Sequence, residues 1–472
     1  MNFIKSRKYA PYNLGRVCVI GLGKTGLAVA QYLINEKNRV ENLHVYAGDK
    51  TKFSMRSGDK LIKCGVSISF DDTTLNNLYD LCIVSPGISP NNSIFMSALK
   101  NCKEVISEVE FAWRESNIDT KWIAVTGTNG KTTTTSMINE ILQFSRKRSK
   151  VVGNIGNVAI EAVMTDRIKS TYEQSEYFVL EISSYQLFTT RLFKPYIAIL
   201  LNITPDHINW HGSYKEYIKA KLKIFENAKN AIINIDDTEV QNHLEEIENN
   251  KSLKNIVKCK KNKNLIEADN GKLKVEICKT EELNVIGEHN YTNARVSCSC
   301  AYMVGCKQDH IKNSIINFMP LEHRIEPVDT VNGRMCYNDS KATNVDACIV
   351  AIKSFKNKNA IFLLGGSDKG TDLTDLVDCS LNYLKGVVCF GESKQRFVDA
   401  FKKRIKDETN FILETDTNLK SAFENAVNIA NKGDFIVLSP ACASFDEFNS
   451  FEERGKYFKN LVKNFKKAEI NI

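Results

Sequence analysis

The stretch that decides the fold is Trp122-Ile-Ala-Val-Thr-Gly-Thr-Asn-Gly-Lys-Thr-Thr133. Its apolar start is typical of a buried strand, and its glycines are typical of a tight loop. Its last residues are typical of the start of a helix. Such a unit binds phosphate, because loop N–H groups and the positive end of the helix dipole attract anions. We therefore expect a nucleoside triphosphate here, with Lys131 against the β and γ phosphates and the Thr132 hydroxyl on Mg²⁺.

The loop departs from the common phosphate-loop spacing in one respect. Val125 stands where the first glycine is expected. The alternative is a chance Gly-Lys-Thr sequence in an ordinary turn, and the strand and helix on either side argue against it.

A second glycine loop, Gly21-Leu-Gly-Lys-Thr-Gly26, follows another apolar run and opens another helical pattern. Asp49 comes after the next apolar run, where a ribose-binding carboxylate is expected. The pattern predicts a nucleotide site, and a purely structural tight turn is the alternative. The loop alone does not identify the nucleotide.

Short apolar runs alternate with helical patterns along the chain, which predicts α/β layers built on parallel sheets. The expected strands are residues 17–20, 81–84, 123–126, 177–180, 197–202, 231–235, 360–364, 387–390 and 435–438. Joints near residues 110–121 and 319–322 divide the chain into domains 1–110, 111–320 and 321–472. Residues 251–282, rich in Lys and Asn, are expected to mix strand and loop.

Composition excludes several classes of protein. The 472 residues carry a net charge of +8, but basic runs such as 258–263 lack interleaved aromatics, so nucleic acid is not expected. No segment has the length and apolarity of a leader or a membrane span. The fourteen cysteines show no CxxC spacing, so we expect free thiols in a reducing cytoplasm. We also expect the protein to be a monomer.

Two more residues follow apolar runs and have oxygen or nitrogen donors for a cation. Glu181 closes one run, and His207 follows another within Asn-Ile-Thr-Pro-Asp-His. Taken singly, Glu181 could open a helix and His207 could be a satisfied core imidazole. Their shared position after parallel strands favours a metal site.

Blocks spread over nearly the whole chain resemble the Mur ligases, which form amide bonds in peptidoglycan precursors. In order, they are GTNGKTT (127–133), EISSYQL (181–187), NITPDHINWHG (202–212), AKLKIF (220–225), GEHNYTNA (287–294), LEHRIE (321–326), NDSKATN (338–344), LLGGSDKG (363–370) and SPACASFDEFNSFEERG (439–455). The first loop, the segment 85–88 and SPACASFDEF (439–448) resemble the branch that adds D-glutamate to UDP-N-acetylmuramoyl-L-alanine. The resemblance implies an ATP-dependent reaction through an acyl phosphate.

The resemblance also implies a role for each matching residue. UDP-substrate contacts are expected from Gly21, Gly23, Lys24, Thr25, Gly26, Asp49, Ser85, Gly87 and Asn154. ATP contacts are expected from Gly127, Thr128, Asn129, Gly130, Lys131, Thr132, Thr133, Asn290, Asn293, Arg324 and Asp339. D-Glutamate contacts are expected from Thr343, Lys369, Ser444, Phe445 and Phe451. Catalysis is assigned to Lys131, His207, Lys221 and Lys369, and two Mg²⁺ sites to Thr132, Glu181, His207 and Lys221.

Lys221 receives its role only from the resemblance, which implies a carbamylated lysine whose new carboxylate helps to hold the second Mg²⁺. Its sequence context alone predicts a solvated helix face. Two residues depart from the family pattern. Asn209 stands where many relatives have aspartate, and Gly48 precedes Asp49 where a second acidic residue is frequent.

Other functions account for only part of the sequence. A nicotinamide-dependent dehydrogenase leaves residues 127–133 without a role. A GTPase is suggested by Asn431-Lys-Gly-Asp434, but that segment lies between a helical pattern and a strand and is expected to be a turn. A ligase for another amino acid, or one that extends folate, is a closer alternative, although folate ligases lack the first domain.

Overall fold

The computed structural model describes residues 3–356, 359–368, 370–405 and 410–470. The chain divides into two compact units. One extends to Glu282 and includes Thr292–Ile316, and the other comprises Leu283–Tyr291 and the chain from Asn317 onward. Helix α12 (Glu288–Met303) therefore begins in the second unit and continues in the first.

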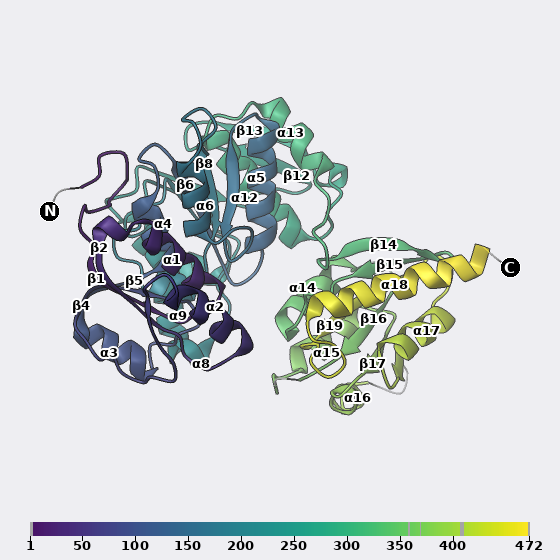
Figure 1. Ribbon diagram of the computed structural model, residues 1–472. Helices are drawn as coiled ribbons and strands as arrows, with labels where there is room; N and C mark the ends of the chain where they lie inside the picture. Colours follow the sequence, from purple (N-terminus) through teal and green to yellow (C-terminus); the bar gives the residue numbers. More distant parts are fainter. Residues whose placement is uncertain (1–2, 357–358, 369, 406–409, 471–472) are drawn as a thin grey trace. The chain divides into compact units, whose positions relative to one another are not determined.

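The first unit begins with a five-stranded parallel sheet in the order β3-β2-β1-β4-β5 (Figure 1). Its strands are β1 (Gly15–Ile20), β2 (Val40–Tyr46), β3 (Ser67–Ser69), β4 (Tyr79–Val84) and β5 (Cys102–Ser107). Its helices are α1 (Lys24–Asn35), α2 (Lys52–Ile62), α3 (Ser93–Asn101) and α4 (Glu108–Glu115). The chain runs outward from β1 to β3 and then returns to β4, so the order reverses between β1 and β4. In open α/β sheets such a reversal opens a ligand-binding crevice.

A six-stranded parallel sheet follows in the order β11-β10-β9-β6-β8-β7. Its strands are β6 (Lys121–Thr126), β7 (Ser149–Gly153), β8 (Tyr177–Glu181), β9 (Ile197–Leu200), β10 (Asn230–Asn234) and β11 (Asn255–Cys259). Helices α5 (Lys131–Phe144), α6 (Ala159–Arg167), α7 (Ser184–Phe188), α8 (Ile208–His211), α9 (Tyr214–Leu222), α10 (Thr238–Asn242) and α11 (Leu244–Glu248) connect the strands. The order reverses between β6 and β9, directly at the loop that follows β6.

A two-stranded antiparallel hairpin, β12 (Leu265–Asp269) with β13 (Lys274–Lys279), follows β11. It confirms the expected mixture of strand and loop in residues 251–282. Helix α12 and helix α13 (Gln308–Asn317) come next, and the Ser297 hydroxyl at the middle of α12 donates to the Thr134 carbonyl of α5.

The second unit contains a six-stranded sheet in the order β14-β15-β19-β16-β17-β18 (Figure 1). Its strands are β14 (Glu326–Val331), β15 (Arg334–Asn338), β16 (Ala360–Gly365), β17 (Gly386–Phe390), β18 (Ile412–Thr415) and β19 (Phe435–Ala441). Its helices are α14 (Val345–Ser354), α15 (Thr374–Tyr383), α16 (Lys394–Lys402), α17 (Leu419–Ile429) and α18 (Phe451–Ile470). Only β14 is antiparallel to its neighbour.

The central strands are buried on both faces, which explains their continuous apolar runs. All four residues of β9 and all six of β16 are buried. Each of the strands predicted from the sequence is present, so the α/β fold with parallel sheets is confirmed. The segment Asn431–Asp434 is a turn, as expected, and the Asp434 carboxylate pairs with Lys385 at 2.5 Å instead of facing a ligand.

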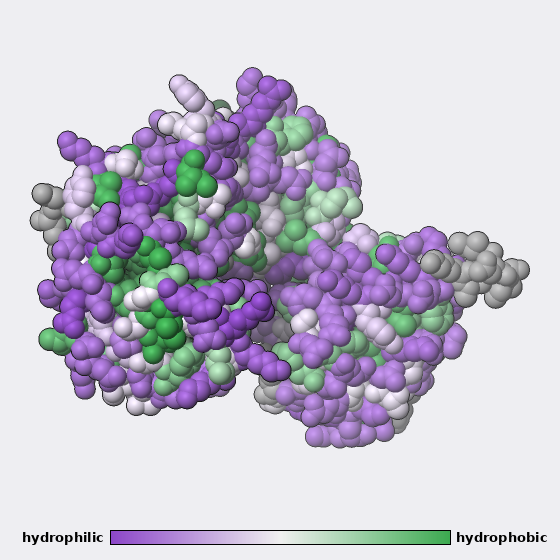
Figure 2. Space-filling model, in the orientation of Figure 1, coloured by the Kyte–Doolittle hydropathy of each residue, from purple (hydrophilic) through white to green (hydrophobic). Residues whose placement is uncertain are grey.

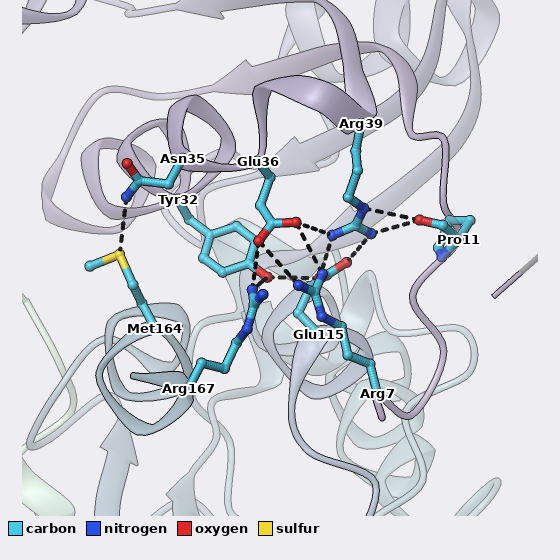
Figure 3. A network of polar contacts seen from close by, with 9 residues as sticks. All are labelled: Arg7, Pro11, Tyr32, Asn35, Glu36, Arg39, Glu115, Met164 and Arg167. Carbon is cyan, nitrogen blue, oxygen red and sulfur yellow. Dashed lines mark hydrogen bonds and ion pairs between the residues drawn. The ribbon is translucent and has the colours of Figure 1, made fainter. Parts of the chain in front are cut away.

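A buried ionic network joins the first two sheet layers within the first unit (Figure 3). Its charged members and their phenol partner are Arg7, Tyr32, Glu36, Arg39, Glu115 and Arg167. Glu115, at the end of α4 and 1% exposed, accepts hydrogen bonds from Arg7, Arg39 and Tyr32. Arg167, at the end of α6, pairs with Glu36 beyond α1 at 2.7 Å. Each charge is paired, which offsets the cost of removing it from water.

Most of the molecular face drawn in Figure 2 is hydrophilic, with apolar residues in small scattered groups. Among the described helices, none has both the length and the apolarity needed to cross a bilayer.

Candidate active site

The loop that follows β6 is held in shape by side chains from neighbouring strands. Asn202, just after β9, accepts from the Asn129 N–H at 2.8 Å and donates to the Asn129 carbonyl at 3.1 Å. The Thr128 hydroxyl lies 2.9 Å from the phenol oxygen of Tyr217 on α9. Gly130 has a φ of 83°, and a Cβ there would lie 2.6 Å from the Asn293 side chain. The loop therefore needs glycine at this position and is ordered by the protein itself.

Two lysines share an acceptor beneath this loop. The Nζ atoms of Lys131 and Lys221 each donate to the Gly127 carbonyl oxygen at 2.8 Å, and Lys131 also donates to the Thr128 carbonyl. Lys221 is 2% exposed. Burial lowers its pKa well below the usual lysine value, and Lys131 lowers that pKa further. The structure thus favours an uncharged amine at Lys221, although the sequence around it predicts a solvated helix face.

Glu181 ends β8 beside β6, where its backbone is in register with Val125. The residue is 5% exposed, and its Oε2 atom is buried without a hydrogen-bond partner among the described residues. Thr132 lies in the first turn of α5, which starts from the neighbouring β6 loop. An unpartnered buried carboxylate oxygen is costly unless a cation or donor is bound. Oxygen donors of this kind fit Mg²⁺.

His207 lies on the connection between β9 and α8 and has a φ of 54°, unusual for a residue with a side chain. Its ring is 4.8 Å from the Tyr185 ring and 6.4 Å from that of Tyr217, between ring centroids. The ring is 46% exposed, and its Nε2 lies 3.4 Å from an Asp206 carboxylate oxygen. His207 is therefore an accessible donor near an acidic side chain, and its surroundings differ from those of a core imidazole.

Two aromatic residues at this site were not assigned from the sequence. Tyr217 lies under the Lys221 Nζ, 4.8 Å from its ring centroid. His211 is buried and close to both His207 and Lys221. Burial, followed by these two neighbours, lowers the His211 pKa to about 4. His211 occurs in the block 202–212 that resembles the Mur ligases, so the sequence offered a signal for it, whereas nothing in the sequence marked Tyr217.

The glycine loop after β1 meets the loop after β4 at the crevice of the first sheet. The Ser85 N–H donates to the Ile20 carbonyl at 2.9 Å, and the Ser85 hydroxyl donates to the Gly21 carbonyl at 3.1 Å. A Cβ on Gly26 would lie 1.8 Å from the Gly21 oxygen, so a larger residue is excluded there. The structure brings these loops together as a nucleotide site requires.

Most of the other residues assigned to the UDP substrate are exposed to solvent. Gly23, Lys24 and Gly87 are exposed and Thr25 is partly buried. Asp49 is exposed after β2, whose last residue, Tyr46, accepts from the Gly21 N–H at 2.8 Å. Asn154 is exposed after β7, and its N–H donates to the Glu181 carbonyl at 3.1 Å.

The two departures from the family pattern have different surroundings. Gly48 has a φ of 72° with open space around it, so the backbone itself favours glycine where an acidic residue is frequent. Asn209 is exposed on α8.

In the second unit, two loops after parallel strands pair with each other. Ser367 and Ala443 exchange backbone hydrogen bonds, and Thr343 follows the neighbouring β15. Ser444 is 2% exposed and Phe445 is 74% exposed. The Phe451 ring lies 3.7 Å from the Lys341 Nζ. Lys369 lies outside the described residues.

Arg454, which was not assigned from the sequence, holds these loops in place. It is 1% exposed and donates to the Cys442 and Ala443 carbonyls and to both oxygens of Ser340. Its fork of N–H donors matches three carbonyls and one hydroxyl from two segments, which explains why arginine occurs here.

The residues assigned to ATP are divided between the units. Thr133 is buried in α5, and Asn293 contacts the loop in the first unit, whereas Asn290, Arg324 and Asp339 belong to the second. Asp339 accepts from the Ile325 N–H at 3.2 Å and from the Ser439 hydroxyl at 2.7 Å. Burial raises the Asp339 pKa to about 7.

Three family models match the chain in succession. They are the Mur ligase MurD-like N-terminal domain over residues 15–107, the Mur ligase middle domain over 125–301, and the Mur ligase glutamate ligase domain over 323–442.

Among solved structures, the fold resembles MurF from Acinetobacter baumannii, with a TM-score of 0.58, 17% identity and coverage of 89% of this chain and 90% of the other. It also resembles MurF from Thermotoga maritima in complex with ADP, with a TM-score of 0.57, 15% identity and coverage of 91% and 96%.

Curated relatives align over almost the full length. The UDP-N-acetylmuramoylalanine–D-glutamate ligase of Thermoanaerobacter pseudethanolicus is 35% identical over 470 residues, covering 95% of this chain and 98% of the relative. The enzyme of the same name from Clostridioides difficile is 32% identical over 473 residues, covering 96% and 99%. The chain therefore belongs to the Mur ligase family, in the branch of the UDP-N-acetylmuramoylalanine–D-glutamate ligases.

Proposed function

We propose that this protein is the ATP-dependent ligase that joins D-glutamate to UDP-N-acetylmuramoyl-L-alanine in peptidoglycan precursor synthesis. The observation that carries the proposal is the shared contact of Lys131 and the buried Lys221 with Gly127, in a glycine loop between a parallel strand and a helix. The arrangement supports binding of a triphosphate, and the family supports the acceptor and the amino acid.

In the ATP site, the N–H groups of residues 127–133 surround the phosphates, and Lys131 leaves its loop carbonyls to contact the β and γ phosphates. Asn290, Asn293, Arg324 and Asp339 position the rest of the nucleotide. Asn293 belongs to the first unit, and Asn290, Arg324 and Asp339 belong to the second.

Mg²⁺ is the cation that the donor set fits. Thr132 and Glu181 would hold one ion, and His207 with a carbamylated Lys221 would hold a second. The ions would offset negative charge on the transferring phosphoryl group. Carbamylation joins the neutral Lys221 amine to CO₂ and releases one proton, which leaves a carboxylate. The buried, uncharged amine supports this assignment, since only a neutral amine is nucleophilic.

The UDP moiety of the acceptor is assigned to the crevice between β1 and β4, where Gly21–Gly26, Asp49, Ser85 and Gly87 would contact it. Asn154 would contact another part of the same substrate. D-Glutamate is assigned to the paired loops of the second unit, with Thr343, Ser444, Phe445 and Phe451. Lys369, by its charge, would bind the glutamate side-chain carboxylate.

The reaction has two steps. The alanyl carboxylate attacks the γ phosphorus of ATP, forming an acyl phosphate and releasing ADP. The neutral amine of D-glutamate then attacks the acyl carbon, the tetrahedral intermediate expels phosphate, and the amine proton is lost to solvent or a base. The acyl phosphate must be kept from water until the amine attacks. The three domains are proposed as 1–110, 111–320 and 321–472, with a hinge near Pro320.

The test is phosphate release with ATP, Mg²⁺, UDP-N-acetylmuramoyl-L-alanine and a panel of amino acids. We expect phosphate release only with D-glutamate, and product of the matching mass. If the enzyme prefers another amino acid, its assignment to the D-glutamate branch is wrong, but the proposed ligase chemistry still stands. Replacing ATP with GTP tests the GTPase alternative, and a nicotinamide fluorescence titration tests the dehydrogenase.

We further propose that the enzyme acts as a monomer in the cytoplasm. Its fourteen cysteines are all free thiols, as a reducing compartment would keep them. Gel filtration with light scattering tests the monomer.

A further inference from the structure

Three cysteines from three strands of the first sheet meet at one point. Their sulfur atoms, those of Cys18 (β1), Cys82 (β4) and Cys102 (β5), all lie within 4.8 Å of one another. The Sγ atoms of Cys18 and Cys102 are 3.8 Å apart. Among the described residues, which include every cysteine, no other group of three potential metal ligands is this close.

This spacing suits three sulfur atoms around one ion. A metal–sulfur bond of about 2.3 Å with tetrahedral angles places two sulfurs about 3.8 Å apart. A disulfide between Cys18 and Cys102 is excluded, because β4 lies between their strands and two strand spacings, about 9.6 Å, exceed the limit of about 7 Å for Cα atoms. The sulfur atoms of Cys18 and Cys102 are therefore close together although the two residues cannot form a disulfide.

The surroundings select the kind of ion. Cys18 and Cys82 are fully buried in an apolar layer with Ile20, Val84 and Phe95. Zn²⁺ prefers four ligands, and three thiolates around a monovalent ion would leave two negative charges in this layer. A trivalent ion bound to three thiolates is neutral and needs no fourth ligand, so it costs least to bury.

We propose that Cys18, Cys82 and Cys102 form a binding site for a trivalent thiophilic ion, with arsenic(III) as the probe. The step is balanced: arsenous acid, As(OH)₃, exchanges its three hydroxyls for three thiol sulfurs, and the three thiol protons leave with them as water. No oxidant is needed. Cys102 is partly exposed and provides the entrance.

The experiment uses the full chain, reduced and without other metals, with arsenite. Intact-mass spectrometry is expected to show one arsenic added for three hydrogens lost, whereas arsenic held by two thiols would retain a hydroxyl. Cys18→Ser, Cys82→Ser and Cys102→Ser should each lose this species and weaken arsenite binding by at least about tenfold. Cys64→Ser, at an exposed cysteine outside the group, should retain both.

Thermal melting distinguishes a lost ligand from a lost fold. Arsenite should raise the melting temperature of the wild-type chain and of Cys64→Ser but leave that of Cys102→Ser unchanged. If a buried variant does not fold, X-ray absorption of the wild-type complex decides instead: three sulfur neighbours support the site, and oxygen neighbours overturn it. Arsenic retained by a folded Cys102→Ser variant with three hydrogens lost would also overturn it. None of these readouts depends on ligase activity.

Discussion

The side-chain nitrogen of Lys221 lies 2.8 Å from the carbonyl oxygen of Gly127, so a buried lysine on α9 directly contacts the loop that follows β6. Lys131 donates to the same oxygen. Burial lowers the Lys221 pKa well below the usual lysine value, and Lys131, which is only partly buried, lowers that pKa further. This difference in burial is consistent with the two proposed roles, phosphate binding for Lys131 and carbamylation for Lys221.

Replacing Lys221 with alanine should reduce kcat at least about 100-fold, because the proposed carbamate carboxylate beside the phosphoryl group is lost. Formate or acetate should restore part of the activity, since either can occupy the vacated space as a carboxylate. Steady-state phosphate release measures both effects. Lys219→Ala is the matched control, because Lys219 is exposed on the same helix and pairs with Glu216 at the surface. A fully active Lys221→Ala enzyme would refute the role.

Replacing Glu181 with glutamine should raise the Mg²⁺ concentration that gives half-maximal activity by at least about tenfold. The amide keeps the size of the side chain but removes its charge, so the buried oxygen attracts a cation less strongly. A Mg²⁺ titration of the rate provides the measurement. Glu176→Gln serves as control, since Glu176 lies just before the same strand and pairs with Arg148. An unchanged Mg²⁺ requirement in Glu181→Gln would remove Glu181 from the metal site.

Replacing Glu115 with glutamine should destabilise the first unit by about 3 kcal/mol, because Arg7 and Arg39 would remain buried with only the Glu36 carboxylate to balance their two charges. Urea denaturation followed by circular dichroism checks the loss. Lys103→Ala breaks the exposed ion pair with Asp80 in the same sheet and should leave the midpoint nearly unchanged. Equal effects of the two changes would mean that the network adds no stability.

Glu108 gives the stability a pH dependence. It is 2% exposed and accepts from the Ile160 N–H at 2.7 Å, and burial raises its pKa to about 7. The folded protein therefore retains this proton at pH values where the unfolded chain has released it. The stability contribution is complete below about pH 4.5 and is lost as the pH rises to about 7, a change of up to about 3 kcal/mol.

Glu108→Gln should remove this slope while keeping an oxygen for the Ile160 N–H. Urea denaturation of wild type and variant at several pH values gives the difference between their slopes between pH 4.5 and 7. Parallel curves would show that Glu108 remains ionised in the folded state.

The sequence by itself determined the local elements of this protein. Strand runs, glycine loops and helix starts depend on neighbouring residues, because backbone geometry and side-chain periodicity act over a few positions. The loop at residues 127–133 and the turn at Asn431–Asp434 were predictable for this reason. The family blocks added the roles of residues that local physics leaves open, such as Lys221.

Only the tertiary structure decided which distant side chains became buried together. Tyr217 contacts Thr128, Arg454 joins two loop segments, and Cys18 meets Cys82 and Cys102. Sheet order and helix packing set these contacts, and no local pattern encodes them. Burial then changed the chemistry. The dehydration that lowers the Lys221 pKa arises from the packed interior and would be absent from the same lysine on a solvated helix.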